Sequence, residues 1–377
     1  MRMRAPGLSL VAVVLLGFVS APALLQEKGG DDRTGPYDVV PNWPLPLGFA
    51  NPGYIWGSTG GVFAESPDRV FIANRGELKL PADKPLPPNF TGAWGFFNEQ
   101  ATTPTPVFRN HIVVVNREGK AIESWTQWDH LFKDGRGPHS VLISPYDPEH
   151  NVWLVDDIHH QIWKFSNDGK KLLMTLGERD EPGSDATHFK RPTDIAWLPD
   201  GTFFVSDGYG NTRVAKFDKN GKFLLDWGVR GTGNGQFQTP HSITIDKNRR
   251  VYVADRANNR VQVFDENGKY LDQFPNITQP YHVRISDDQF LWVFSGPLDK
   301  FLKYDLNGKL LYAWGTHGTA PGLFWAVHEF SVDSEGNLYT AEVFGGRAQK
   351  FRPRQGADPS HFFKPQPLMP KSGAAAN

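Results

Sequence analysis

Short apolar runs that alternate with polar residues recur along most of the chain, and Asn-Gly or Asp-Gly pairs often separate them. The stretch "VYVADRANNRVQVFDENGKYLDQF" (251–274) is typical, because two apolar runs end at polar turns and "NGK" leads into a third run. Asn-Gly and Asp-Gly supply the positive φ that tight hairpin turns need, and alternation with a period of two marks half-buried strands. The pattern therefore predicts antiparallel strands joined by short turns.

The same four-strand pattern returns after roughly 40 to 50 residues, which is the length of a propeller blade. Its copies cover 137–177, 191–228, 239–274, 279–315 and 326–354, and a further copy begins at 60–76 and resumes at 111–125. Blades of four strands arranged around a ring form β-propellers. The sequence thus predicts an all-β fold, a six-bladed β-propeller. An open β-solenoid fits less well, because it must cap the strand edges that a closed ring protects.

The repeats also set the limits of the domain, which we expect to span 24–354. The stretch 77–110 is rich in proline and aromatic residues and interrupts the first blade, where we expect either a lid or rim element or a decorated surface loop. The last copy lacks a clear fourth strand, so "YDVVPNW" (37–43) is expected to supply it and close the ring. The tail, 355–377, is expected to be flexible.

The N-terminus has the composition of a secretory signal peptide, residues 1–23. Arg2 and Arg4 precede the apolar run "LSLVAVVLLGFV", and small residues follow at Ala21 and Ala23. The run is too short for a membrane-spanning helix, which needs about 20 residues. We expect a secreted protein, periplasmic or extracellular, whose mature chain starts near Leu24.

Composition removes several classes of function. The chain has no cysteine, so neither a disulfide nor a thiol nucleophile is available. Its 40 Lys and Arg residues against 41 Asp and Glu residues lack the basic excess that nucleic-acid binding requires. We therefore expect no nucleic-acid partner and no membrane span, and a monomer that acts on a small-molecule or peptide substrate.

A histidine follows a proline at the start of an expected innermost strand in "GPHSVLIS" (137–144) and "TPHSITID" (239–246), and "WAVHEFSVD" (325–333) matches more weakly. Around the ring, the aligned residues are Gly60, His139, Thr193, His241, Tyr281 and His328. The histidines occupy every second blade, so a pseudo-threefold axis makes them face one another across the central channel. Three imidazoles around an open position suit a catalytic zinc ion, although each histidine alone is more often an ordinary strand residue.

A second set of aligned residues lies in the turns between the second and third strands. Tyr209 in "SDGYGN" and Arg256 in "ADRANN" share this place in neighbouring blades, and Arg75 in "IANRG" has it in the first. If these turns rim the mouth of the channel near the histidines, two cations and a phenol converge on the metal.

At these residues the sequence resembles the peptidyl-α-hydroxyglycine α-amidating lyases, which are NHL-repeat propellers. The most specific parts are "PGSDATHFKRPTDIAWLPDGTFFVSDGYGNTRVAKF" (182–217) and "GQFQTPHSITIDKNRRVYVADRANNRVQVF" (235–264). The resemblance implies that His139, His241 and His328 ligate zinc and that Arg75, Tyr209 and Arg256 are catalytic. It also implies a possible calcium ion held by the backbone carbonyls of Val62 and Val141 and by Glu329.

The chain departs from the family pattern at three places. The family has aspartate at the position of Glu329 and methionine at that of Ala326, and animal members carry a cystine at that of Gly210.

The implied reaction is the cleavage of an α-hydroxyglycine to an amide and glyoxylate. Zinc would bind the hydroxyl oxygen, the arginines would pair with the substrate carboxylate, and Tyr209 would act as the base. Two other functions remain open at this point. One is a non-catalytic NHL propeller that binds a protein or glycan, and the other is a calcium-dependent lactonase on the same fold.

Overall fold

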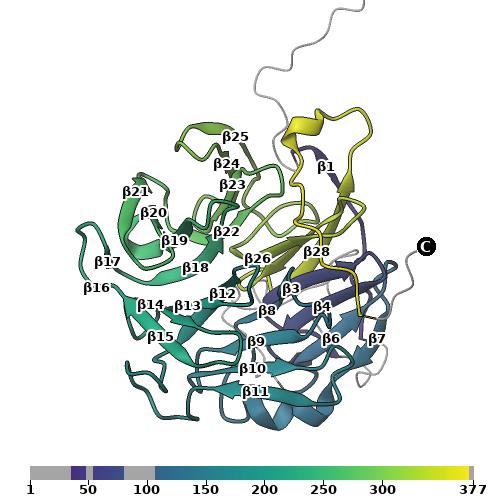
Figure 1. Cartoon of the computed structure of the whole chain (residues 1–377). Helices are drawn as coiled ribbons and strands as arrows, with labels where there is room; N and C mark the ends of the chain where they lie inside the picture. Colours follow the sequence, from purple (N-terminus) through teal and green to yellow (C-terminus); the bar gives the residue numbers. More distant parts are fainter. Residues whose placement is uncertain (1–34, 48–53, 80–106, 373–377) are drawn as a thin grey trace, which may run out of the picture. The chain divides into compact units, whose positions relative to one another are not determined.

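The computed structural model describes residues 35–47, 54–79 and 107–372, all of which lie in one compact unit, 32–377. Its strands form six four-stranded antiparallel sheets, which confirms the six-bladed β-propeller (Figure 1). The first three blades are β3 (Thr59–Ser66), β4 (Arg69–Asn74), β6 (Ile112–Val115) and β7 (Ala121–Ser124); β8 (Ser140–Ile143), β9 (Val152–Asp156), β10 (Gln161–Phe165) and β11 (Leu172–Leu176); and β12 (Pro192–Trp197), β13 (Phe203–Asp207), β14 (Arg213–Phe217) and β15 (Phe223–Trp227). The other three are β18 (Pro240–Ile245), β19 (Val251–Asp255), β20 (Arg260–Phe264) and β21 (Tyr270–Phe274); β22 (Pro280–Ile285), β23 (Leu291–Ser295), β24 (Lys300–Tyr304) and β25 (Leu310–Trp314); and β26 (Val327–Val332), β27 (Leu338–Glu342), β28 (Arg347–Pro353) and β1 (Tyr37–Val39).

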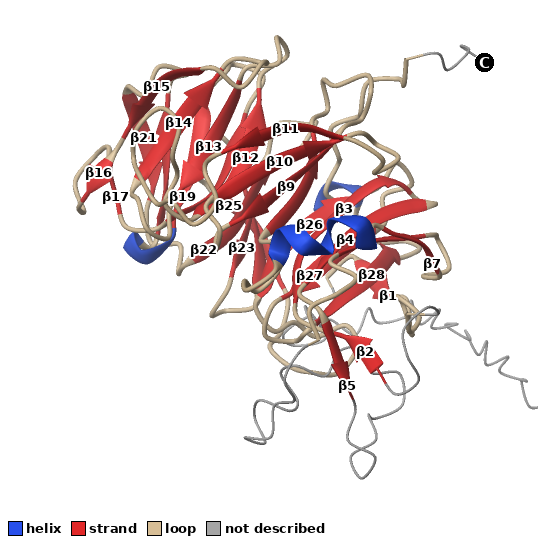
Figure 2. Ribbon diagram, turned by 90° about the horizontal axis from the view of Figure 1, so that it is seen from below, coloured by secondary structure: helices blue, strands red, loops and turns tan. Residues whose placement is uncertain are grey.

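Strands supply most of the regular structure of the described residues (Figure 2). The smaller elements are the two-stranded pairs β2 (Tyr54–Trp56) with β5 (Glu77–Lys79) and β16 (Val229–Arg230) with β17 (Gln236–Phe237), and the 3-10 helices η1 (Thr126–Phe132), η2 (Arg256–Asn258) and η3 (Pro359–His361). No helix in the described ranges has the length and apolar character to cross a membrane.

The ring closes as the sequence predicts. β1, from the N-terminal side of the domain, pairs with β28 at the end of the last repeat, with Tyr37 opposite Pro353 and Val39 opposite Phe351. In Figure 1 the purple β1 lies beside the yellow β28. Both ends of the repeat region therefore belong to one sheet, and its outermost strand lies far from the other three in sequence.

Burial follows the position of a strand within its blade. The innermost strands β12 and β18 are buried along their whole length, whereas the outermost strands β11 and β15 alternate between half-buried and exposed residues. Apolar side chains of neighbouring blades pack against each other. One such core joins Tyr252 of the fourth blade to Val283 and Leu302 of the fifth. Since blade-to-blade packing buries the apolar faces, the innermost strands are held at fixed positions around the channel.

A bulge marks the start of most innermost strands. In five of the six, pairing with the second strand shifts at the aligned position, so that Gly60, Thr193, His241, Tyr281 and His328 are extra residues. In the second blade, His139 directly precedes β8 and donates its backbone N–H to the Val155 carbonyl at 2.7 Å. A bulge leaves one residue outside the ladder and re-aims its side chain. These bulges are the local reason why the aligned residues occupy equivalent places around the channel.

The C-terminal segment differs from the flexible tail predicted for it. Within its described part, Phe363 packs into a core cluster with Tyr37 and Trp292, and Lys303 Nζ donates to the Ser360 carbonyl at 2.6 Å. Met369 N–H donates to the Pro145 carbonyl at 2.9 Å. This segment is held because it buries an apolar side chain that the pattern of repeats does not reveal.

Two other predictions fall mainly on residues outside the described ranges. The predicted signal peptide, 1–23, lies wholly outside them, as does 80–106 of the predicted insertion. At the ends of the insertion, Glu77 and Val107 exchange two backbone hydrogen bonds of 2.8 Å, which ties the described ends together.

Candidate metal centre and active site

The structure brings together the three histidines that the repeats align. One ring nitrogen from each of His139, His241 and His328 lies within 4.8 Å of those of the other two. The ring centroids are 4.4 Å apart for His139 and His328, 4.9 Å for His241 and His328, and 5.2 Å for His139 and His241. All three side chains are buried. This arrangement has the donor set and the compactness of a three-histidine metal site.

Hydrogen bonds fix which nitrogen of each ring is free. His241 Nδ1 lies 2.6 Å from the Tyr281 carbonyl and His328 Nδ1 lies 2.7 Å from the Gly60 carbonyl, so both Nδ1 atoms must donate. His139 Nδ1 lies 3.0 Å from Ser140 Oγ, whose own proton goes to the Thr193 carbonyl at 2.9 Å. His139 Nδ1 therefore donates as well, and in all three rings Nε2 keeps its lone pair.

The protonation state also suits a metal. Burial lowers the pKa of His139, His241 and His328 well below the ordinary value for histidine, so the three rings are neutral. His139 Nε2 is buried and makes no hydrogen bond with the described residues. Neutral imidazoles oriented through Nδ1, with Nε2 turned to a shared point, are the usual metal-binding form of histidine. The residues present therefore fit a divalent metal such as zinc.

Tyr209 lies directly at this cluster. Its Oη is 2.8 Å from His241 Nε2, and Arg256 Nη1 donates to the same oxygen at 3.3 Å. Arg256 is itself fixed by Tyr281, since its Nη2 donates to Tyr281 Oη at 2.9 Å and its guanidinium lies 3.9 Å from the Tyr281 ring centroid. The predicted tyrosine thus contacts both a histidine of the cluster and one of the predicted arginines.

Arg75, the third predicted residue, is buried. Its Nε donates to the Pro138 carbonyl at 3.2 Å, while its buried Nη2 has no hydrogen-bond partner among the described residues. Burial lowers the pKa of Arg75 to about 10, and the neighbouring Arg136 cation contributes to that shift. Because a buried guanidinium nitrogen without a partner is costly, this atom is suited to an anionic ligand.

These side chains share one open pocket at the channel mouth, with about 1070 Å³ of empty space, open solvent included. Arg75, Tyr209, Arg256, Tyr281 and His328 line it.

Comparisons with known proteins agree with the geometry. An NHL repeat model matches residues 237–264. Peptidyl-α-hydroxyglycine α-amidating lyase 1 of Drosophila melanogaster is 32% identical over 262 residues, a match that covers 59% of this chain and 46% of the fly protein. This chain is a homologue of the peptidyl-α-hydroxyglycine α-amidating lyases.

Two further comparisons concern a longer relative of this amidating-lyase homologue and a solved structure with the same fold. Peptidyl-glycine α-amidating monooxygenase A of Xenopus laevis is 30% identical over 266 residues, which cover 66% of this chain and 27% of the frog protein. The matches thus span less than half the length of either curated relative. A solved streptogramin B lyase superimposes with a TM-score of 0.54 at 12% identity, covering 84% of this chain and 98% of that one, and so shares the fold.

The structure of this amidating-lyase homologue adds pocket residues that the sequence analysis missed. Arg136 and Arg191 also line the pocket, and both lie against the Tyr209 ring, at 5.8 Å and 4.9 Å from its centroid. A signal for them does exist in the sequence. Arg191 directly precedes Pro192 and Arg136 stands two residues before Pro138. Both therefore lie just before an aligned residue at the start of an innermost strand.

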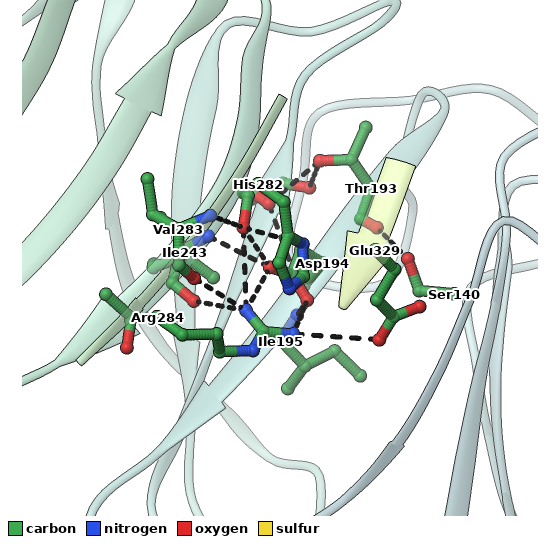
Figure 3. A network of polar contacts seen from close by, with 12 residues as sticks. Ser140, Thr193, Asp194, Ile195, Ile243, His282, Val283, Arg284 and Glu329 are labelled. Carbon is green, nitrogen blue, oxygen red and sulfur yellow. Dashed lines mark hydrogen bonds and ion pairs between the residues drawn. The ribbon is translucent and has the colours of Figure 1, made fainter. Parts of the chain in front are cut away.

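Of the residues implied for a calcium ion, Glu329 belongs to a network of polar contacts (Figure 3). Glu329 is buried and accepts the Val141 backbone N–H at 3.3 Å, and its Oε1 lies 3.7 Å from Arg284 Nη2. Arg284 Nη1 also pairs with Asp194 Oδ2 at 2.9 Å. A calcium ion needs six to eight oxygen ligands, whereas here a guanidinium already lies beside both carboxylates. The described residues near Val62, Val141 and Glu329 therefore fit calcium poorly.

Proposed function

We propose that this chain is a zinc-dependent lyase that cleaves a peptidyl-α-hydroxyglycine-like substrate to an amide and glyoxylate. The observation that carries the proposal is the 2.8 Å contact between Tyr209 Oη and His241 Nε2, which joins a phenol to the donor atoms of a three-histidine cluster. The relationship to the fly lyase supports the same chemistry.

The substrate carboxylate would pair with Arg75. This arginine is buried and its Nη2 lacks a hydrogen-bond partner among the described residues, so a carboxylate would satisfy a donor that the protein leaves open. Charge-assisted hydrogen bonds between guanidinium and carboxylate are strong and directional. The pairing would orient the α-carbon toward the histidine cluster.

The proton would move through Tyr209. Once its own proton has left for the solvent, Tyr209 Oη would accept the hydroxyl proton of the substrate, with Arg256 Nη1 donating to that oxygen at 3.3 Å. The carbon–oxygen bond then becomes the carbonyl of glyoxylate, the carbon–nitrogen bond breaks, and the nitrogen takes the proton back from Tyr209. A zinc ion held by His139, His241 and His328 would supply Lewis acidity toward the substrate oxygen.

A glyoxylate assay tests the proposal. Purified protein with measured zinc content would be incubated with N-benzoyl-α-hydroxyglycine, and glyoxylate and benzamide would be quantified. Equal amounts of both products, lost on chelation and restored by zinc, are expected. Zinc-loaded protein that releases neither product contradicts the lyase. Calcium as the only bound metal would favour the lactonase, and no bound metal would favour the binding protein.

The same proposal includes export. The composition of residues 1–23 supports a cleaved signal peptide, so the lyase would act in the periplasm or outside the cell. The proposal takes the active form to be a monomer.

A further inference from the structure

A buried aspartate holds two arginines at the wall of the pocket. Asp157 is fully buried and follows β9. Arg136 Nη2 donates to both of its carboxylate oxygens at 2.9 Å, and Arg191 Nη2 donates to Oδ2 at 2.6 Å. The Nε atoms of both arginines also donate to Asp157, at 3.2 Å and 3.1 Å. One carboxylate thus orients two guanidinium groups that come from the starts of neighbouring blades.

The charges of the pocket do not balance. Arg75, Arg136, Arg191 and Arg256 line it, and no acidic side chain does so among the described lining residues. Of these four, only Arg136 and Arg191 form an ion pair with a described residue, and both pair with Asp157. Four guanidinium charges against one carboxylate leave an excess of three positive charges before any metal is bound. An acyl-α-hydroxyglycine with a neutral acyl group brings only one negative charge.

The pair and Arg75 differ in their depth. Arg75 is only 9% exposed, whereas the side chains of Arg136 and Arg191 are 39% and 36% exposed and so remain accessible from the pocket. Asp157 uses Nε and Nη2 of each arginine, which leaves Nη1 of both outside that contact. Guanidinium groups fixed in this way can bind an anion at a small cost in side-chain entropy.

We propose that Arg136 and Arg191 form a second anion subsite, which selects substrates that carry a carboxylate on the acyl side of the α-hydroxyglycine. A peptide with an acidic residue near its C-terminal end has this chemistry. This inference rests on the proposed lyase function and specifies its substrate class. Arg75 takes the α-carboxylate, and the Asp157-oriented pair takes the second one.

Matched substrates test the subsite. We would compare N-acyl-α-hydroxyglycines whose acyl group ends in a carboxylate, from succinyl to adipoyl, with the terminal amide of each. At least one diacid is expected to exceed its amide about tenfold or more in kcat/KM, mainly through KM, which is the size expected for one charge-assisted contact. In Arg191→Gln this preference should fall to near one. Arg249→Gln serves as the control, because Arg249 pairs with Asp200 and Glu266 and does not line the pocket.

Each outcome has one meaning. No glyoxylate from any substrate contradicts the lyase itself. Equal kcat/KM for every diacid and its amide overturns the subsite while leaving the lyase intact. If Arg191→Gln slows diacids and amides by the same factor, the arginine only positions Tyr209 and the subsite is again overturned. As a readout apart from turnover, glutarate should raise the melting temperature of the wild type more than that of Arg191→Gln, and an equal rise contradicts the subsite.

Discussion

Replacing Arg284 by methionine is expected to destabilise the propeller by about 3–5 kcal/mol, the usual cost of removing one partner of a buried ion pair. Methionine keeps most of the side-chain length but removes the charge. Asp194 and Glu329, whose side chains are 2% and 1% exposed, would then face each other without a cation. At a separation near 3 Å, the Arg284–Asp194 contact alone has a Coulomb energy of roughly 6 kcal/mol if the effective dielectric constant is about 20.

Chemical denaturation measures this loss, with Arg249→Met as the matched control. The Arg249 side chain is 41% exposed in its ion pairs, so its replacement should cost less than about 1 kcal/mol. Added calcium should leave the stability of the wild type unchanged, because Arg284 already supplies the internal cation. A loss below about 1 kcal/mol for Arg284→Met, or stabilisation of the wild type by calcium, would refute this reasoning.

Three further predictions concern the site and the two ends of the chain. Tyr209→Phe should lower turnover by about 10²–10⁴ with metal content unchanged. His241→Ala should lose metal and activity together. Wild-type turnover by Tyr209→Phe would show that Tyr209 is not the base. Truncation after residue 354 should cost about 2–3 kcal/mol or more in denaturation experiments, since it exposes the core around Phe363, and an unchanged stability would contradict the packing of this segment. Mass spectrometry of exported protein should find an N-terminus near Leu24, and an intact Met1 on soluble cytoplasmic material would argue against the signal peptide.

The sequence by itself determined the architecture and the alignment of the histidines. Strand alternation and Asn-Gly turns are local signals, and a repeated unit that cannot bury its faces alone must pack against copies of itself. Once the repeats are aligned, the places of His139, His241 and His328 around the ring follow, and so does the closing of the ring by 37–39. The symmetry of the ring is enough to predict that the three histidines meet, without any information about contacts between distant residues.

Only the tertiary structure decided which charges meet. Asp157 holds Arg136 and Arg191 from two different blades, and Arg284 joins Asp194 to Glu329 across the channel. The repeats align some of these positions, since Asp194 and Glu329 each directly follow an aligned residue. Other blades have different residue types there, so the repeats give no reason to pair the charges. The packing of the C-terminal segment through Phe363 also cannot be predicted from the repeats, because its partners lie within the blades. Periodic patterns report the burial of each strand, whereas ion pairs and tail contacts depend on side chains that meet only after the blades have packed.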